Sequence, residues 1–352
     1  MDPDSVEGVR ASGGDGAADA IGPDGRVPHG SSDDPDVLDF SANTNPRVPP
    51  GAEKAYRAAF EAARSYPADD YPEFREAAAA FVDCKPSQVI PTAGGLEAIR
   101  LAIQTTARAG DSVLLPYPSF GEYAREVRLQ GATPEFVPHD ELLAADPASH
   151  ALAVVCNPNN PTGEAADPAA LRNFADRCRA AGTTLLVDEA FLGFTDEPSR
   201  AGREGVIVAR SLTKLFGLPG IRMGYAVGTG DERDRLATAR RAWSMSAAAA
   251  AVGAHCYRQT EFVAETKARV TGERARMRER LNARFDVFRS DAPFLLLSVS
   301  DADASVDDIL ASAREAGIAL RDARTFRGLD SHIRVAVRAP EENDRLLDAL
   351  DV

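Results

Sequence analysis

The sequence predicts an α/β protein in which a large domain with a mostly parallel sheet is joined to a smaller α+β domain. Five short apolar runs between residues 112 and 228 lack the polar alternation of half-exposed strands, which is typical of strands buried on both faces. Segments of helical periodicity separate most of these runs, as in a parallel sheet covered by helices. After a long charged helical region at about 230–287, strands and helices alternate in a smaller unit.

The order of the elements follows from periodicity and from glycine stop signals such as Gly131 and Gly182. Before the charged region we expect helices at 51–63, 73–82, 94–109, 123–131 and 168–182, and strands at 112–117, 151–158, 183–190, 206–211 and 223–228. After it we expect strands at 294–299, 318–322 and 332–338, with helices at 305–316 and from residue 341 onward.

Three regions divide the chain. Residues 1–28 are rich in Gly, Asp, Ala and Ser without periodicity, and we expect them to form a flexible N-terminal arm. We assign 61–254 to the large domain, and 29–60 together with 255–352 to the small domain.

The composition limits the kinds of molecule that the protein is expected to bind. The chain has 352 residues and a net charge of −14, which argues against nucleic acid or an acidic membrane surface as a partner. The four cysteines form no C-x-x-C pair and the five histidines are dispersed, so we expect no metal site. No apolar run reaches membrane-spanning length and no signal peptide is evident, so we expect a cytoplasmic protein.

Ligands of parallel sheets bind beyond the carboxyl ends of the strands, where this sequence carries polar residues. The glycines of TAGGLEAI at 92–99 open a helix whose free N–H groups could cradle an anion, although an ordinary glycine turn is the alternative. In NPNNPTG at 157–163, Asn160 could bond a ligand oxygen, or the loop could simply be stiffened by proline.

Two further strand ends carry charge. Asp188 ends an almost wholly apolar strand, where a carboxylate needs a partner, either a helix end or ion pair of the protein or a cationic heterocycle. Lys214 follows the next strand, and an amine in a partly apolar site can form a Schiff base. Ser211, Thr213 and Arg222 suit a phosphate. With the ring of Phe120 as a platform, these groups together fit pyridoxal 5'-phosphate.

The motifs NPNNPTG, DEAF and SLTK-x7-R-x-GY resemble, in order and spacing, those of fold-type-I pyridoxal-phosphate enzymes, the aspartate aminotransferase superfamily. The resemblance extends from about His29 to the C-terminal region. Within the superfamily the chain is similar to histidinol-phosphate aminotransferases and to the threonine-phosphate decarboxylases of cobalamin synthesis.

The resemblance implies cofactor-binding roles. Lys214 would carry the cofactor, and Asp188 would keep the pyridine nitrogen protonated. Tyr66, in SYPADDYP, is similar to a tyrosine that reaches the cofactor phosphate of the partner subunit, which implies a homodimer. The other cofactor contacts would be ring stacking by Phe120, a bond from Asn160 to the ring hydroxyl, and phosphate binding by Gly95, Leu96, Ser211, Thr213 and Arg222.

The substrate would be a phosphorylated amino acid. Arg334, in HIRVAVR, resembles the arginine that clamps the substrate carboxylate. Arg321 is the phosphate candidate because its planar fork forms paired bonds, with a surface ion pair to Asp322 as the alternative. Asn43 and His29 would close over the phosphate.

Decarboxylation of L-threonine O-3-phosphate is the leading functional hypothesis. Aminotransferases usually read D-E-A-Y, whereas Phe191 stands here, and decarboxylases tolerate this phenylalanine. One motif departs from the decarboxylase pattern, because decarboxylases usually carry H-G-G-N and this chain reads HGSS at 29–32. Two other motifs, AWSMSA at 242–247 and F-x-E-Y at 120–123, look more like the decarboxylase. The alternatives are histidinol-phosphate transamination, another class I/II aminotransferase, or a regulator without activity, which would not need Lys214, Asp188 and Arg222 together.

Overall fold

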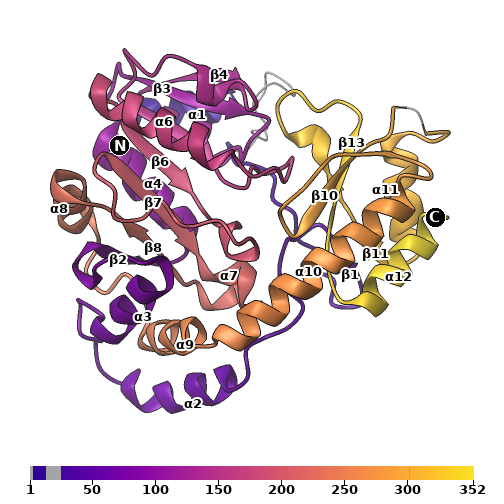
Figure 1. Cartoon of the computed structure of the whole chain (residues 1–352), viewed down its shortest axis with the longest axis horizontal. Coiled ribbons are helices and arrows are strands. Elements are labelled where there is room, and N and C mark those ends of the chain that lie inside the picture. The colour runs from indigo at the N-terminus through magenta and orange to yellow at the C-terminus, as the bar shows by residue number, and fades with distance from the viewer. Residues whose placement is uncertain (1–2, 13–24, 301) are drawn as a thin grey trace.

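The computed structural model describes residues 3–12, 25–300 and 302–352. A large sheet with its helices occupies one side of the molecule, the C-terminal elements occupy the other, and the long helix α10 (Thr260–Leu281) runs between them (Figure 1). Single-turn 3-10 helices lie at Pro86–Gln88, Leu142–Ala144, Leu192–Phe194, Pro219–Ile221 and Ala323–Thr325.

The large sheet has seven strands in the order β2-β8-β7-β6-β5-β3-β4. All run parallel except β8, which is antiparallel to both neighbours, so the expectation of a mostly parallel sheet is confirmed. The segment between β7 and β8 contains only the short helix α7 and a single 3-10 turn, without a helix long enough for a parallel crossover. The strands are β2 (Val89–Thr92), β3 (Ser112–Tyr117), β4 (Thr133–Pro138), β5 (Leu152–Cys156), β6 (Thr184–Asp188), β7 (Val206–Ser211) and β8 (Gly224–Val227).

Helices cover both faces of this sheet because successive strand side chains point to opposite faces. Val113 and Leu115 of β3 belong to one buried cluster, whereas Leu114 belongs to another. The first cluster includes residues of α4 (Gly95–Thr106), α5 (Glu122–Leu129) and α8 (Gly230–Ala239). The second includes residues of α3 (Pro72–Val82), α6 (Pro168–Ala181), α9 (Ala247–Tyr257) and α10.

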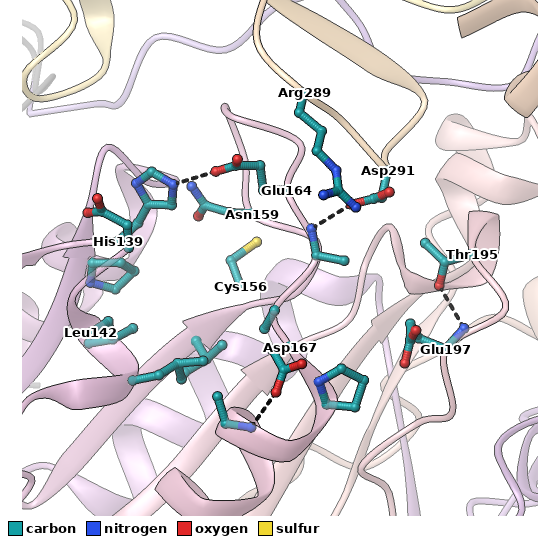
Figure 2. Close-up of a pocket in the computed structure, with 18 of the residues that line it drawn as sticks. His139, Leu142, Cys156, Asn159, Glu164, Asp167, Thr195, Glu197, Arg289 and Asp291 are labelled. Carbon is teal, nitrogen blue, oxygen red and sulfur yellow. Dashed lines mark hydrogen bonds and ion pairs between the residues drawn. The ribbon is translucent and has the colours of Figure 1, made fainter. Parts of the chain in front are cut away.

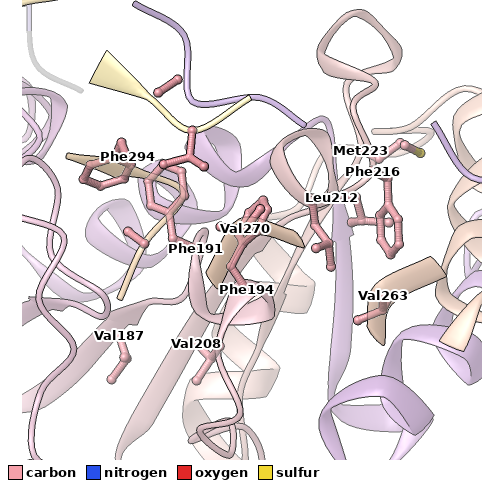
Figure 3. Close-up of a cluster of buried hydrophobic side chains, with 14 of the residues drawn as sticks. Val187, Phe191, Phe194, Val208, Leu212, Phe216, Met223, Val263, Val270 and Phe294 are labelled. Carbon is pink, nitrogen blue, oxygen red and sulfur yellow. The ribbon is translucent and has the colours of Figure 1, made fainter. Parts of the chain in front are cut away.

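The second cluster also anchors the short helix α7 (Leu212–Leu215), which carries Lys214. Leu212 and Phe216 flank this lysine and are buried in the cluster, which reaches Val263 of α10 (Figure 3). Each large apolar side chain buried there contributes about 1.5–3 kcal/mol. Lys214 is therefore carried by a short helix whose neighbouring side chains are packed into the core.

The C-terminal elements form a four-stranded antiparallel sheet in the order β12-β13-β10-β9. A separate parallel pair joins β1 (Leu38–Asp39) to β11 (Ile318–Ala319), which ties the N-terminal segment to this part of the chain. Helix α2 (Ala52–Ala62) instead packs against α9. The predicted domain boundaries remain predictions. The other elements are β9 (Asp286–Val287), β10 (Phe294–Ser298), β12 (Arg321–Asp322), β13 (His332–Ala336), α11 (Val306–Glu315) and α12 (Pro340–Ala349).

The first residues differ from the expectation for an arm without regular structure. Residues 3–12 form helix α1 (Pro3–Ser12), which packs against α5 with Val9 buried. Residues 13–24 lie outside the described part of the chain. Beyond them, the carbonyl of Gly25 accepts a hydrogen bond from Arg125 Nε at 2.9 Å. In the part of the chain that the structure describes, no helix is both long and apolar enough to cross a bilayer.

Candidate active site

A cavity of about 350 Å³ lies at the carboxyl ends of β5, β6 and β7 and extends to the C-terminal sheet. It brings together residues that the sequence separates by up to 307 positions, from Val27 to Arg334. Of the predicted site residues, those lining it are His29, Asn43, Gly95, Leu96, Phe120, Asn160, Asp188, Ser211, Thr213, Lys214, Arg222, Arg321 and Arg334.

Lys214 belongs to α7, is partly buried and lines this cavity. Burial, followed by the positive charges of Arg334 and Arg222, lowers the pKa of its ammonium group to about 8. A sizeable fraction of neutral amine is therefore present near neutral pH, as a nucleophilic lysine requires.

Asp188 ends β6 and is almost completely buried. Its Oδ2 accepts a hydrogen bond from the Tyr123 hydroxyl at 2.5 Å, and its Oδ1 accepts one from the Ala190 amide at 3.0 Å. Burial raises the pKa of the Asp188 carboxyl group, while these two hydrogen bonds oppose the rise. A cationic partner inside the cavity would favour the ionised carboxylate.

The start of α4 forms a cradle that excludes side chains. A Cβ at Gly94 would lie 2.7 Å from Arg222 Nη2, and one at Gly95 would lie 2.9 Å from Ser211 Cβ. Ser211 Oγ and Thr213 Oγ1 are 2.8 Å apart at the same place. Free N–H groups of a helix start, two hydroxyls and a guanidinium together form an anion site.

The aromatic wall of the cavity consists of Phe120 with two polar neighbours. His29 packs against Phe120 with ring centroids 5.8 Å apart, and its Nε2 lies 3.1 Å from Glu122 Oε1. Tyr123 meets the same phenylalanine edge-on at 5.6 Å. The ring of Phe120 is thus held in position to contact a flat ligand.

Arg334 is buried at the C-terminal side of the cavity. Its Nη1 donates to Asn160 Oδ1, and its Nη2 donates to the Ser41 carbonyl at 3.0 Å. The guanidinium lies 5.0 Å from the ring centre of Phe294. Burial and then Arg321 lower the pKa of Arg334, but a guanidinium remains protonated near neutrality.

Arg321 is buried as well, and the alternative of a surface ion pair with Asp322 is wrong. Its Nη2 donates to the Pro28 carbonyl at 2.7 Å and to Thr325 Oγ1 at 2.8 Å, whereas Asp322 pairs with Arg324 at 2.8 Å. The end of the predicted N-terminal arm is therefore part of the cavity wall.

Asn43 and Tyr66 differ in their surroundings. Asn43 is buried, and its Oδ1 has no hydrogen-bond partner among the described residues, although buried amides are normally paired. Tyr66 does not line the cavity of its own chain, and 77% of its surface is exposed.

A second, larger cavity of about 900 Å³ contains none of the predicted site residues (Figure 2). Some of its polar side chains are bonded to each other or to the backbone: His139 pairs with Glu164 at 3.0 Å, and Asp291 accepts a hydrogen bond from the Ala165 amide at 3.1 Å. Asp167 caps the start of α6. We therefore place the active site in the smaller cavity.

The profile of the family described as aminotransferase class I and II matches residues 35–350. This chain belongs to that family. Its fold is the type I fold of aspartate aminotransferase, and the family depends on pyridoxal phosphate.

Relatives of this class I/II aminotransferase family member carry different activities in their names. A protein of Caldanaerobacter subterraneus subsp. tengcongensis, named provisionally as a threonine-phosphate decarboxylase, is 31% identical over 330 residues and covers 88% of each chain. Histidinol-phosphate aminotransferase 1 of Archaeoglobus fulgidus is 28% identical over 322 residues, covering 89% of this chain and 98% of the relative. Histidinol-phosphate aminotransferase is the more frequent name among further relatives.

A solved structure shows the same fold. The histidinol-phosphate aminotransferase of Sinorhizobium meliloti, crystallised with pyridoxal 5'-phosphate, matches with a TM-score of 0.79 and 22% identity over 88% of each chain.

The residues of this family member fit the cofactor. The Gly94–Gly95 cradle leaves room for a phosphate where a Cβ would clash, and no cationic side chain among the described residues is bonded to the buried Asp188. Lys214 supplies an amine in the same cavity. The individual roles assigned to these residues remain predictions.

The sequence motifs missed the residues that hold the site residues in place. Tyr123 bonds Asp188, and Glu122 bonds His29, yet both were noted only as part of the F-x-E-Y motif. Glu122 and Tyr123 lie two and three residues after Phe120, at the start of α5, and this nearness to a predicted site residue could have identified them. Cys156, at the end of β5, also lines the cavity.

Proposed function

We propose that this chain is a pyridoxal-phosphate-dependent decarboxylase of L-threonine O-3-phosphate, which yields (R)-1-aminopropan-2-yl phosphate in cobalamin biosynthesis. The observation that carries the proposal is the pairing of two buried arginines in the cavity of Lys214. Arg321 of β12 lies directly opposite Arg334 of β13 in the antiparallel register. Facing residues of such strands have Cβ atoms about 4.5–5.5 Å apart, so the site favours one small substrate with two anionic groups.

Each arginine suits a different end of that substrate. Arg334 would receive the carboxylate, because it is held by its bond to Asn160 and by Phe294. Arg321 would receive the phosphate, with Asn43 and His29 on the same side. The amide oxygen of Asn43 has no donor among the described residues, so a water or a donor group of the substrate would complete its bonding.

The reaction needs an electron acceptor and a proton donor. The chemistry supplied by bound pyridoxal phosphate is an electron-accepting ring, for which Asp188 would hold the ring nitrogen protonated. The bond from the α-carbon to the carboxylate breaks, carbon dioxide leaves, and a proton joins the same carbon. Lys214 Nζ, whose pKa burial lowers to about 8, can donate that proton near neutral pH.

Phe191 supports the choice of reaction. It lines the cavity and packs edge-on against Phe294 at 5.1 Å, so this position offers an apolar ring where aminotransferases usually offer a hydroxyl. The second candidate is histidinol-phosphate aminotransferase, which the names of several relatives favour.

A product assay separates the two candidates. Purified holoenzyme is given threonine phosphate alone, and separately histidinol phosphate with 2-oxoglutarate. Carbon dioxide released only in the first reaction is the expected result. Glutamate formed in the second reaction, without carbon dioxide from the first, would assign the aminotransferase instead.

We also propose that the enzyme is a homodimer whose cofactor site is shared. Tyr66 is exposed on its own subunit, which is consistent with its predicted action in the cavity of the partner.

A further inference from the structure

Tyr66 and Trp243 form a stacked aromatic pair on the surface. Their ring centroids lie 4.4 Å apart and their planes are inclined by 28°. Half of the surface of Trp243 is exposed, and this residue is the only tryptophan of the chain. It lies in the AWSMSA segment, which does not line the cavity.

Two loops hold this pair in place. The loop that follows α2 contains Asp69, whose carboxylate accepts bonds from Arg240 Nη2 at 2.7 Å and from the Trp243 amide at 2.7 Å. In the same loop, the buried Tyr71 hydroxyl donates to the Met245 carbonyl at 2.8 Å and accepts from the Met245 amide at 3.0 Å. The loops at 63–71 and 240–246 are therefore cross-linked by charged and buried polar bonds.

The backbone of Trp243 is strained. Its φ of 50° lies in the left-handed region, which is an outlier for a bulky residue and persists only where the surroundings impose it. The bond from its amide to Asp69 imposes that conformation here. The molecule thus holds an exposed indole in an unfavourable conformation with its face against Tyr66.

We propose that Trp243 is a positioning residue for Tyr66, whose phenol it directs into the cavity of a second copy of this chain, while Asp69 fixes the indole. The inference rests on the proposed homodimer with a shared cofactor site. The occupant of this surface is a second copy because Tyr66 does not line its own cavity. Helix α2, which leads to Tyr66, also exposes Tyr56 and Phe60, and such aromatic groups are typical of protein interfaces.

The test measures cofactor affinity and oligomeric state of the full chain. Apoprotein is titrated with pyridoxal 5'-phosphate by absorbance, and sedimentation reports the dimer. Trp243→Ala should weaken cofactor binding roughly five- to tenfold, the factor expected for loss of a stacked pair, while the dimer persists. Trp243→Phe is the matched control and should bind within about twofold of wild type, since a ring can still stack.

A double variant distinguishes positioning from general stabilisation. Tyr66→Ala with Trp243→Ala should bind the cofactor no more weakly than Tyr66→Ala alone, because the indole acts only through the phenol. Losses that multiply, or unchanged affinity in Trp243→Ala, would overturn the inference. Asp69→Ala, which releases the indole without removing it, should reproduce the loss if Trp243→Ala does not fold.

The outcome for the wild-type protein separates this inference from the proposed function. A wild-type chain that binds no cofactor would overturn the proposed function and this inference together. One that binds the cofactor but stays monomeric would overturn the proposed shared site and this inference, and would leave the proposed reaction standing. A wild-type dimer that loads normally, with Trp243→Ala indistinguishable from it, would overturn the positioning role alone.

Discussion

Lys214 combines burial with two cationic neighbours, and this combination predicts how it takes up the cofactor. Only the neutral amine attacks an aldehyde, and the pKa of Lys214 is lowered from its usual value to about 8. The rate at which apoprotein takes up pyridoxal phosphate should therefore rise with pH and level off just above pH 8, as stopped-flow absorbance would show.

Free Nα-acetyl-lysine is the control for this rate, because its amine should keep gaining reactivity up to about pH 10. Borohydride should then fix the cofactor on the peptide that contains Lys214. A label on another lysine, or a protein rate that parallels the free amine, would contradict this assignment.

Asp188 is the second residue with a specific consequence. Asp188→Asn removes the charge that would keep the ring nitrogen protonated but preserves the shape of the side chain. Turnover should fall by more than about a hundredfold, since breaking a buried ionic contact costs about 3 kcal/mol or more. Circular dichroism should show an unchanged fold, and a variant that keeps most of its turnover would make Asp188 a structural residue.

Tyr123→Phe provides a graded comparison, because it removes only the hydroxyl that bonds Asp188. We expect turnover to fall roughly ten- to a hundredfold, as for the loss of one hydrogen bond to a charged group.

At the scale of elements, the turn into α4 sets the space for the phosphate. Gly94 has a φ of 98°, and a Cβ there would meet Arg222 at 2.7 Å. Gly94→Ala should therefore destabilise the protein by about 1–2 kcal/mol through backbone strain and also weaken cofactor binding.

Gly110→Ala is the matched control for this prediction. Gly110 has a similar φ of 87° but no atom within 4 Å of its added Cβ. It should lower the melting temperature to a comparable extent and leave cofactor affinity unchanged. Equal affinities in the two variants would mean that the turn is not part of the phosphate site.

The strands that the sequence analysis missed show where local patterns stop being informative. β2 and β4 are the two edges of the large sheet, and both contain proline, Pro91 in β2 and Pro134 in β4. Proline lowers the strand signal in a sequence, yet an edge strand tolerates it because one side of its backbone needs no partner. The central strands carry apolar runs that are interrupted only near their ends, as by Pro116 in β3, and they were predicted at nearly their observed positions.

The candidate site likewise combines residues that local motifs predict with contacts that no local motif predicts. Lys214, Asp188 and Arg222 stand in local motifs at the ends or starts of strands, so their sequence context was sufficient to select them. The bonds from Tyr123 to Asp188 and from Arg321 to the Pro28 carbonyl join residues 65 and 293 positions apart. Such contacts depend on how the elements pack, which no local pattern contains.

For the whole molecule, the shared site predicts complementation between subunits. Lys214→Ala and Tyr66→Phe subunits, each inactive or nearly so, should regain part of the activity when mixed, because a mixed dimer has one cavity with both native residues. Subunit exchange must first be shown, for example with differently tagged chains. If exchange occurs and Tyr66→Phe alone is severe, yet activity stays absent, then Tyr66 does not act across the dimer.

The charges lining the cavity contrast with those of the molecule that surrounds it. Arg321 and Arg334, the two arginines assigned to the substrate, line the cavity, whereas the chain carries a net charge of −14. An anionic substrate is therefore repelled at long range and attracted only once it reaches the opening. Exposed charges interact over about 30 Å at 0.01 M salt and over about 10 Å at 0.1 M. Added salt therefore weakens the repulsion by the distant surface charges more than it weakens the attraction inside the cavity. When the salt concentration is raised from 0.01 M to 0.1 M, kcat/KM should therefore rise, whereas it usually falls for oppositely charged partners. Chloride and acetate at equal ionic strength are the control, and they should give the same dependence.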